Sequence, residues 1–99
     1  MHAKTAYLFA ELDIEDAEYF YQEYMPRVPA VLKEYGATFL AASGQPFVKE
    51  GDRNVKRVVL LEFESLQRAQ EFYHSPSYQA VIGHRLKSAR THLYIFEGS

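Results

Sequence analysis

The 99-residue sequence predicts a single α+β domain, residues 1–99, in which strands and helical regions follow the order β-α-β-β-α-β. The first observation is that four short segments rich in aliphatic and aromatic residues fit strands. They are residues 6–12, 37–43, 57–63 and 92–97. The second observation is that the segments after the first and third of these carry apolar residues at spacings of three and four, the period of an amphipathic helix. This order is that of the ferredoxin-like fold, a four-stranded antiparallel sheet with helices on one face.

The composition excludes several classes of protein. The net charge is −2 and charges of both signs are mixed along the chain, which argues against a nucleic-acid-binding surface. Cysteine is absent, which excludes disulfides, thiolate chemistry and cysteine metal sites. No apolar run approaches the roughly 20 residues of a membrane helix, and the N-terminus has no apolar core of a signal peptide. We therefore expect a cytoplasmic protein that does not enter the membrane.

The first helical region has start, break and stop signals. Asp13 is its predicted N-cap, because an aspartate side chain accepts hydrogen bonds from the first free N–H groups. Pro26 and Pro29 fall inside the helical pattern, and each removes a backbone donor. We therefore expect a kink or break near residues 25–28. Gly36 suits the left-handed position that ends a helix.

The second half of the chain has similar signals. The second and third strands are expected to form a hairpin with a long loop, whose turn lies at residues 51–54. Ser65 and Ser75 are the predicted N-caps of two further helices, and Pro76 occupies the first position of the last one. The buried side of that helix is predicted to carry Tyr78, Val81, Ile82, Arg85 and Ala89.

The face of the sheet without helices is predicted to be apolar. Side chains of a strand alternate between faces, and the alternation places these residues on that face: Tyr7, Phe9, Glu11, Thr38, Leu40, Ala42, Val58, Leu60, Glu62, His92, Tyr94 and Phe96. So much apolar surface is too large to leave in water. We therefore predict a homodimer in which a second copy packs face to face on it.

A set of motifs spread over the chain resembles a known family. It comprises Glu50-Gly51, residues 57–63, Ser65-Leu66, Ala69, Phe72-Tyr73, Ser75-Pro76-Ser77-Tyr78 and Arg85, together with Tyr24 and Tyr35-Gly36. These residues resemble the DUF1330 family over almost the whole chain. The resemblance implies a dimeric α/β barrel, in which two sheets pack across a two-fold axis. Relatives within that wider fold include cofactor-free monooxygenases, haem enzymes and small-molecule lyases, so the fold does not select an activity.

Three side chains are candidates for catalysis. Glu62 lies in an otherwise apolar strand, where burial would favour its protonated form and suit it to acid–base work. The alternative is a carboxylate that pairs with Arg57, Arg85 or a backbone donor. His92 and Tyr94 share one strand face and suit proton transfer and stabilisation of an enolate-like oxygen. The alternative for both is a packed or interface residue.

Two further residues are candidates for substrate binding. Arg85, on the inner side of the last helix, has the planar fork that binds a carboxylate. Its alternative roles are a structural ion pair or a helix C-cap. Tyr7, on the open face, is the second candidate. Neither a metal-ligand spacing nor a glycine-rich phosphate loop occurs, so we predict no metal and no cofactor.

The sequence leaves two functions open. The first is a homodimer with a small aromatic-lined cavity that binds a small organic molecule, on which Glu62, His92 and Tyr94 carry out cofactor-independent acid–base or oxygenation chemistry. The second is a non-enzymatic dimer that binds a ligand or is purely structural. A cavity of roughly several hundred Å³ with converging polar groups favours the first, and a filled interface favours the second.

Overall fold

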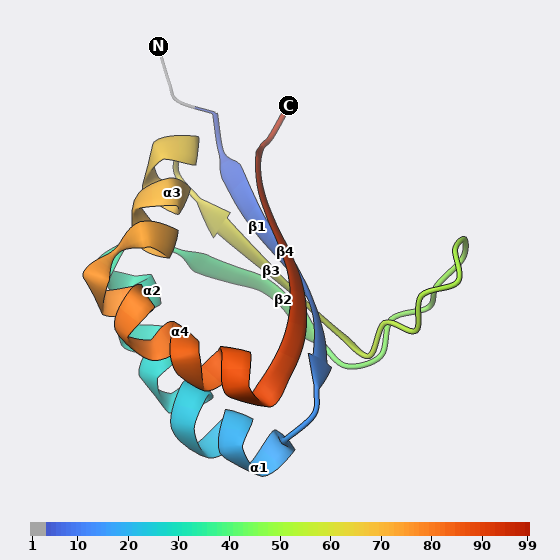
Figure 1. Cartoon of the computed structure of the whole chain (residues 1–99). Coiled ribbons are helices and arrows are strands. Elements are labelled where there is room, and N and C mark those ends of the chain that lie inside the picture. Colours follow the sequence, from blue (N-terminus) through green and yellow to red (C-terminus); the bar gives the residue numbers. More distant parts are fainter. Residues whose placement is uncertain (1–3) are drawn as a thin grey trace.

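Residues 4–99 are described by the computed structural model, and they form one antiparallel sheet with helices on one face (Figure 1). The strands are β1 (Ala6–Ile14), β2 (Thr38–Ser43), β3 (Arg57–Phe63) and β4 (Ala89–Glu97). They lie in the order β2-β3-β1-β4, each antiparallel to its neighbour. The predicted ferredoxin-like architecture is confirmed. Part of the N-terminal segment for which we predicted no signal peptide, residues 1–3, lies outside the described residues.

The first helical region is broken, as predicted. It consists of α1 (Ala17–Tyr19), the π-helical turn η1 (Phe20–Tyr24), the 3₁₀ turn η2 (Met25–Arg27) and α2 (Val28–Glu34). Pro26 has no N–H to donate, and the hydrogen-bond pattern changes from π to 3₁₀ one residue before it. Gly36 adopts a φ of 68° and ends the region, which confirms its predicted role.

The start of this region differs from the prediction. Asp13 is not its N-cap, because β1 continues to Ile14 and Asp13 pairs with Arg90 in the sheet. Asp16 is the cap instead, and its side chain accepts a hydrogen bond from the backbone N–H of Tyr19 at 3.1 Å. Because β1 pairs with β4 as far as Ile14, this strand is longer than the alternation of its own apolar and polar residues predicts.

The last two helices begin where predicted. α3 (Leu66–His74) is capped by Ser65, whose hydroxyl accepts from the N–H of Arg68, and α4 (Pro76–Ser88) is capped in the same way by Ser75. β4 starts directly after α4, earlier than predicted, because Ala89 pairs with Ile14. Ala89 therefore belongs to the sheet, and its predicted place on the helix is wrong.

The core lies between the sheet and the helices. Its strand residues are Ala6, Leu8, Ala10, Leu12, Leu61, Phe63 and Ala89, and its helix residues are Phe20, Tyr24, Val28, Val31, Leu32, Ala69, Phe72 and Tyr78. Aromatic rings fill the centre, with centroids of Phe72 and Tyr78 4.6 Å apart and those of Phe63 and Phe72 5.3 Å apart. Burying one such ring contributes about 1.5–3 kcal/mol, so this cluster is a main source of stability.

The predicted faces are confirmed for β1, β3 and β4, but β2 contains a bulge. The register of β2 against β3 shifts between Phe39 and Ala41, so that Ala41 lies opposite Leu60 and Ala42 lies opposite Val59. Ala42 therefore faces the helices, and its predicted place on the open face is wrong. A bulge inserts one residue and reverses the alternation that follows it.

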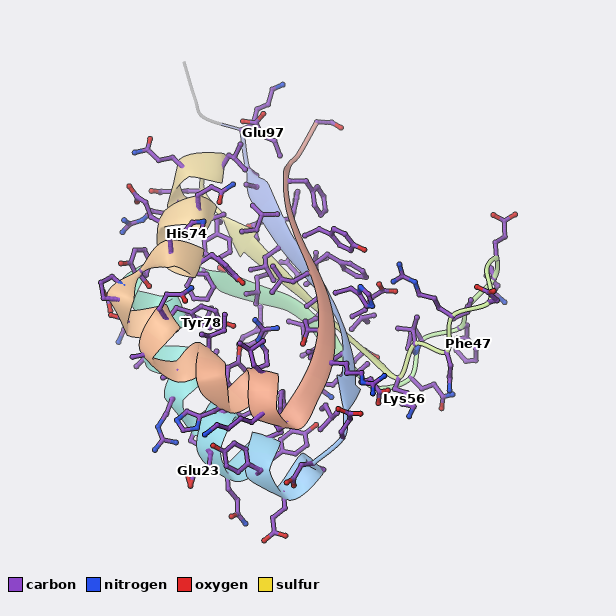
Figure 2. The ribbon with its side chains drawn as sticks, in the orientation of Figure 1. Glu23, Phe47, Lys56, His74, Tyr78 and Glu97 are labelled. Atoms are coloured by element: carbon purple, nitrogen blue, oxygen red, sulfur yellow. The ribbon has the colours of Figure 1, made fainter. Side chains whose placement is uncertain are left out.

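The segment between β2 and β3, residues 44–56, forms an arm that projects from the body on the side away from the helices (Figure 1). Gly51 near its tip has a φ of 102°, which only glycine adopts readily. At its base, Lys56 pairs with Asp13 at 3.2 Å and Arg53 pairs with Glu11. Phe47 is 90% exposed along the arm (Figure 2). The arm therefore carries apolar surface away from the core.

Candidate functional site

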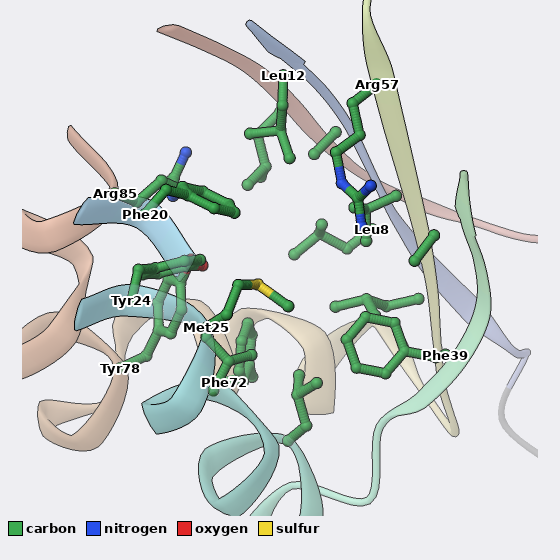
Figure 3. Close-up of a pocket in the computed structure, with 17 residues that line it drawn as sticks. Leu8, Leu12, Phe20, Tyr24, Met25, Phe39, Arg57, Phe72, Tyr78 and Arg85 are labelled. Atoms are coloured by element: carbon green, nitrogen blue, oxygen red, sulfur yellow. The ribbon is translucent and has the colours of Figure 1, made fainter. Parts of the chain in front are cut away.

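A small cavity lies between the sheet and the helices, and we call it the helix-side cavity. Its volume is about 60 Å³, well below the several hundred Å³ that the sequence-based expectation of a substrate cavity called for. Most of its lining is apolar, and it includes Leu8, Leu12, Phe20, Met25, Phe39 and Ala42. Four side chains with polar groups also line it, namely Tyr24, Arg57, Tyr78 and Arg85 (Figure 3). An apolar pocket with a few convergent polar groups is the usual character of a ligand site.

The broken helix builds one wall of this cavity. In the π turn the N–H of Met25 donates to the carbonyl of Phe20, five residues earlier. The wider turn brings Phe20, Tyr24 and Met25 to the same side, and all three line the cavity. π turns are frequent at functional sites, and the adjacent Pro26 marks this one in the sequence.

Arg85 is the most unusual group in the cavity. It projects from α4, is only 4% exposed, and its Nε–H has no acceptor within residues 4–99. The ion pairs formed in that part of the chain include neither Arg85 nor Arg57. A buried charge without a counter-ion is strongly unfavourable, and within residues 4–99 the polar group beside Arg85 is the hydroxyl of Tyr24. The predicted alternative of a structural ion pair is not formed.

Two tyrosine hydroxyls meet beside Arg85. The hydroxyl oxygens of Tyr24 and Tyr78 lie 2.6 Å apart in the interior. Burial, with a smaller contribution from Tyr78, raises the pKa of the Tyr24 hydroxyl well above its ordinary value, and the nearby Arg85 acts in the opposite direction. Tyr24 is therefore neutral at physiological pH. One hydroxyl donates to the other, so one hydrogen of the pair stays available for a third group.

A second cavity, the open-face cavity, lies on the other side of the sheet between β1, β4 and the base of the arm. Its volume is about 230 Å³. Its lining is mainly polar and includes Glu11, Arg53, Arg90 and His92. Tyr94, and then the charge of Glu11, raise the pKa of the Arg53 guanidinium, so this group stays protonated. In this cavity the guanidinium of Arg53 already forms an ion pair with the carboxylate of Glu11.

The predicted site residues fall on two faces of the sheet. Arg85 lies on the helix side, whereas Glu62, His92, Tyr94 and Tyr7 lie on the open face. Of these four, His92 lines the open-face cavity. The sheet therefore separates the predicted anchor from the predicted acid–base groups. The five residues do not form one site within a single copy of the chain.

Glu62 has a simple environment. It is partly buried on the open face, opposite Tyr7 on β1 and Thr38 on β2. The ion pairs within residues 4–99 do not include it, and Arg57, one of its proposed partners, points to the helix-side cavity. Glu62 is therefore a carboxylate in an apolar face, with no cation attached to it in the described part of the chain.

Sequence reasoning missed part of the helix-side cavity. The position of Arg57 could have been predicted from the sequence. It stands two residues before Val59 in the same strand, so both side chains lie on the face that meets the helices. The Tyr24–Tyr78 pair has no local signal, since the two residues lie 54 positions apart. Their meeting depends on how α4 packs against the π turn.

Across residues 4–99, no cluster of three or more His, Cys, Asp or Glu side chains is placed to hold a metal ion. Each helix in the same range is too short or too polar to cross a membrane.

Comparison with known proteins identifies a family and a fold. Residues 5–99 match the model of a family described as "Domain of unknown function (DUF1330)". No curated protein matches the chain. A protein of unknown function from Rhodopseudomonas palustris is 16% identical, with a TM-score of 0.77, over 97% of this chain and 83% of that one. A dimeric ferredoxin-like protein of unknown function from Jannaschia sp. CCS1 is 14% identical, with a TM-score of 0.74, over 95% and 99% of the two chains.

A third solved structure carries a named activity. SnoaB, a cofactor-independent oxygenase from Streptomyces nogalater, is 8% identical to this chain with a TM-score of 0.60. The alignment covers 98% of this chain and 95% of SnoaB. At such low identities the similarity of all three structures establishes the ferredoxin-like fold and nothing about activity.

Proposed function

This chain belongs to the DUF1330 family, and we propose that it forms a homodimer whose helix-side cavity binds a small organic molecule. One observation carries the proposal: a mostly apolar cavity receives two guanidinium groups that form no ion pair within residues 4–99, and a pair of tyrosine hydroxyls with one hydrogen left to donate. Packing alone would fill this space with aliphatic side chains. A ligand explains both the space and the polar groups.

The size of the cavity limits the ligand. If one water-sized group needs roughly 10–15 Å³, the volume of about 60 Å³ holds about four to six non-hydrogen atoms. Phe39 lines the cavity and is itself exposed, so the cavity reaches the surface beside β2. Met25 is unbranched and flexible, and rotation of its side chain would enlarge the space. Small metabolites therefore fit better than drug-sized molecules.

The open face supports the proposed homodimer. Tyr94 and Phe96 on β4 are 48% and 46% exposed, and Leu40 on β2 is also exposed. A domain of this size buries a smaller share of its surface than a larger domain does, so covering such a face with a second copy adds stability. The arm projects to the same side and presents Phe47 to a partner. The description of the Jannaschia protein as dimeric supports this arrangement.

Cofactor-independent catalysis is a second candidate, favoured by the Tyr24–Tyr78 pair beside Arg85. A hydroxyl and a guanidinium that both donate hydrogen bonds would stabilise an oxygen that becomes negative during a reaction. SnoaB, which shares the fold, works without a cofactor according to its description. However, the lining of the helix-side cavity includes no carboxylate or histidine to accept a proton. A catalytic role for Glu62, His92 and Tyr94 would instead require a substrate at the open face.

Filling the cavity tests the binding proposal. Ala42→Leu places a larger side chain into the helix-side cavity, and Ala80→Leu makes the same change at an exposed position of α4. A panel of acids, alcohols and amides of four to six non-hydrogen atoms is screened by thermal shift. We expect at least one compound to raise the Tm of the wild type and of Ala80→Leu but not of Ala42→Leu. Equal shifts in all three proteins, or none in the wild type, would contradict the proposal.

A further inference from the structure

Building on the proposed binding function, we infer that the ligand of the helix-side cavity is a small organic carboxylate, whose charged end contacts Arg85 and Arg57. The cavity thus selects for charge as well as for size. The inference depends on three independent features: an unpaired buried cation, a second cation in the opposite wall, and the lack of any competing anion.

The first feature is the state of Arg85. Its side chain is almost fully buried, and within residues 4–99 its Nε–H donates to nothing. A guanidinium in a low-dielectric site needs both a counter-charge and hydrogen-bond acceptors. A carboxylate supplies both at once, because its two oxygens match the planar fork of an arginine.

The second feature is Arg57. It comes from the first residue of β3, in the wall of the cavity that the sheet provides, whereas Arg85 comes from α4 (Figure 3). Two like charges facing one small space repel each other, and a bound anion between them removes that repulsion. The bulge in β2 turns Ala42, which is exposed, toward the same cavity.

The third feature is the absence of an internal anion in the lining. No acidic side chain lines the helix-side cavity. Tyr24 is neutral at physiological pH, as tyrosine ordinarily is, and burial raises the pKa of its hydroxyl further. The Tyr24–Tyr78 pair instead offers a hydrogen to a ligand oxygen. The cavity therefore presents donors and positive charge only.

The rest of the lining describes the body of the ligand. Leu8, Leu12, Phe20 and Met25 are apolar, so a fully hydrated ion such as inorganic phosphate would lose water without compensation on that side. A carboxylate with a short aliphatic chain suits both the positively charged end of the cavity and its apolar part. Isobutyrate has six non-hydrogen atoms and fits the estimated capacity of about four to six such atoms.

A matched pair of probes tests the inference. Isobutyrate and isobutyramide have the same shape and number of non-hydrogen atoms, and only the first is an anion. Titration calorimetry of the whole protein should give an affinity for isobutyrate at least about tenfold higher than for isobutyramide, since hydrogen bonds to charged groups are the stronger ones. In ¹⁵N spectra, isobutyrate should shift the Nε–H signal of Arg85, which now lacks an acceptor.

Variants assign the effect to the two arginines. Arg85→Met should abolish isobutyrate binding, and Arg57→Met should weaken it by roughly tenfold. Arg27→Met is the matched control, because Arg27 is exposed, pairs with Glu23 and lies away from the cavity. It should bind isobutyrate as the wild type does.

The outcomes separate this inference from the proposal on which it depends. Equal affinities for isobutyrate and isobutyramide, both lost in Ala42→Leu, would overturn the carboxylate inference and leave the binding function standing. Binding of neither probe would overturn the carboxylate inference, and only a panel in which no compound stabilises the wild type would overturn both. Isobutyrate binding that survives in Arg85→Met would overturn the assignment to Arg85, even if the charge preference remained.

Discussion

The hydroxyl oxygens of Tyr24 and Tyr78 lie 2.6 Å apart and join the π turn of the first helical region to α4. The N–H of Tyr78 is itself held by the Ser75 cap at 3.0 Å, so the start of α4 positions this hydroxyl. Arg85 lies about two turns further along the same helix. The contact therefore aligns the two elements that carry the polar groups of the helix-side cavity.

The Tyr24 hydroxyl should make stability depend on alkaline pH. Its pKa in the folded protein lies above the ordinary 10.0, so the native state keeps this proton where the unfolded chain has lost it. This stabilisation is complete below pH 10 and declines as the pH rises further, by about 1.4 kcal/mol per pH unit. In Tyr24→Phe that decline should be smaller, while the lost hydrogen bond costs about 1 kcal/mol at pH 7. Urea unfolding at several pH values measures both effects.

Tyr21→Phe is the control for this experiment. Tyr21 is exposed and is not part of the lining of the helix-side cavity. The variant should show the same alkaline decline as the wild type. An unchanged decline in Tyr24→Phe would mean that another group causes it.

Arg85→Met should stabilise the ligand-free protein. Methionine has a similar length, and replacing buried charges by apolar side chains often raises stability by about 1–4 kcal/mol. Chemical denaturation at one protein concentration measures the change. The exposed Arg27→Met should change stability by less than about 0.5 kcal/mol. A loss of several kcal/mol in Arg85→Met would show that the guanidinium has a structural partner after all.

A charge on the open face should prevent association. Leu60 lies at the centre of this face on β3, and Phe96 lies on β4. If a second copy covers them, Leu60→Asp and Phe96→Asp should give monomers or insoluble protein at micromolar concentration, whereas the wild type sediments as a dimer. Leu86→Asp, on the exposed side of α4, should remain dimeric. A wild type that sediments as a monomer rules the dimer out.

The arm should contribute to the same dimer. Phe47 is 90% exposed within its own chain, so Phe47→Ser should change the unfolding of a monomeric Leu60→Asp background by less than about 0.5 kcal/mol. In the wild-type background it should raise the dimer dissociation constant by roughly tenfold, since a buried aromatic ring is a typical interface anchor. Sedimentation over a dilution series measures this constant. An unchanged constant would mean that the arm does not touch the partner.

Glu62→Gln tests whether the carboxylate belongs to the scaffold. No cation contacts Glu62 within residues 4–99, so the amide should change the unfolding free energy by less than about 1 kcal/mol or raise it. Thermal and urea unfolding measure the change. A drop of about 3–5 kcal/mol would instead indicate a buried ion pair that forms in the assembled protein. Retention of bound isobutyrate should not depend on this residue, which lies across the sheet from the cavity.

Local signals predicted most of the elements. The serines at positions 65 and 75, and Pro26 with Gly36, each act on the backbone within a few residues, so their effects are visible in the sequence. The helix and strand boundaries that we predicted wrongly depend on pairing partners far along the chain. Asp13 and Ala89 both look helical locally, yet pairing between β1 and β4 places them in the sheet.

The chain by itself determined the fold, because the alternation of its strands and the capping of its helices are short-range properties that agree with one another. It also marked Arg85 as a group that faces inward. Only the tertiary structure decided that a bulge in β2 turns Ala42 toward the helices and that the hydroxyls of Tyr24 and Tyr78 meet beside Arg85. A residue's face depends on strand register, and the partners of a buried group depend on packing between distant segments, neither of which is encoded locally.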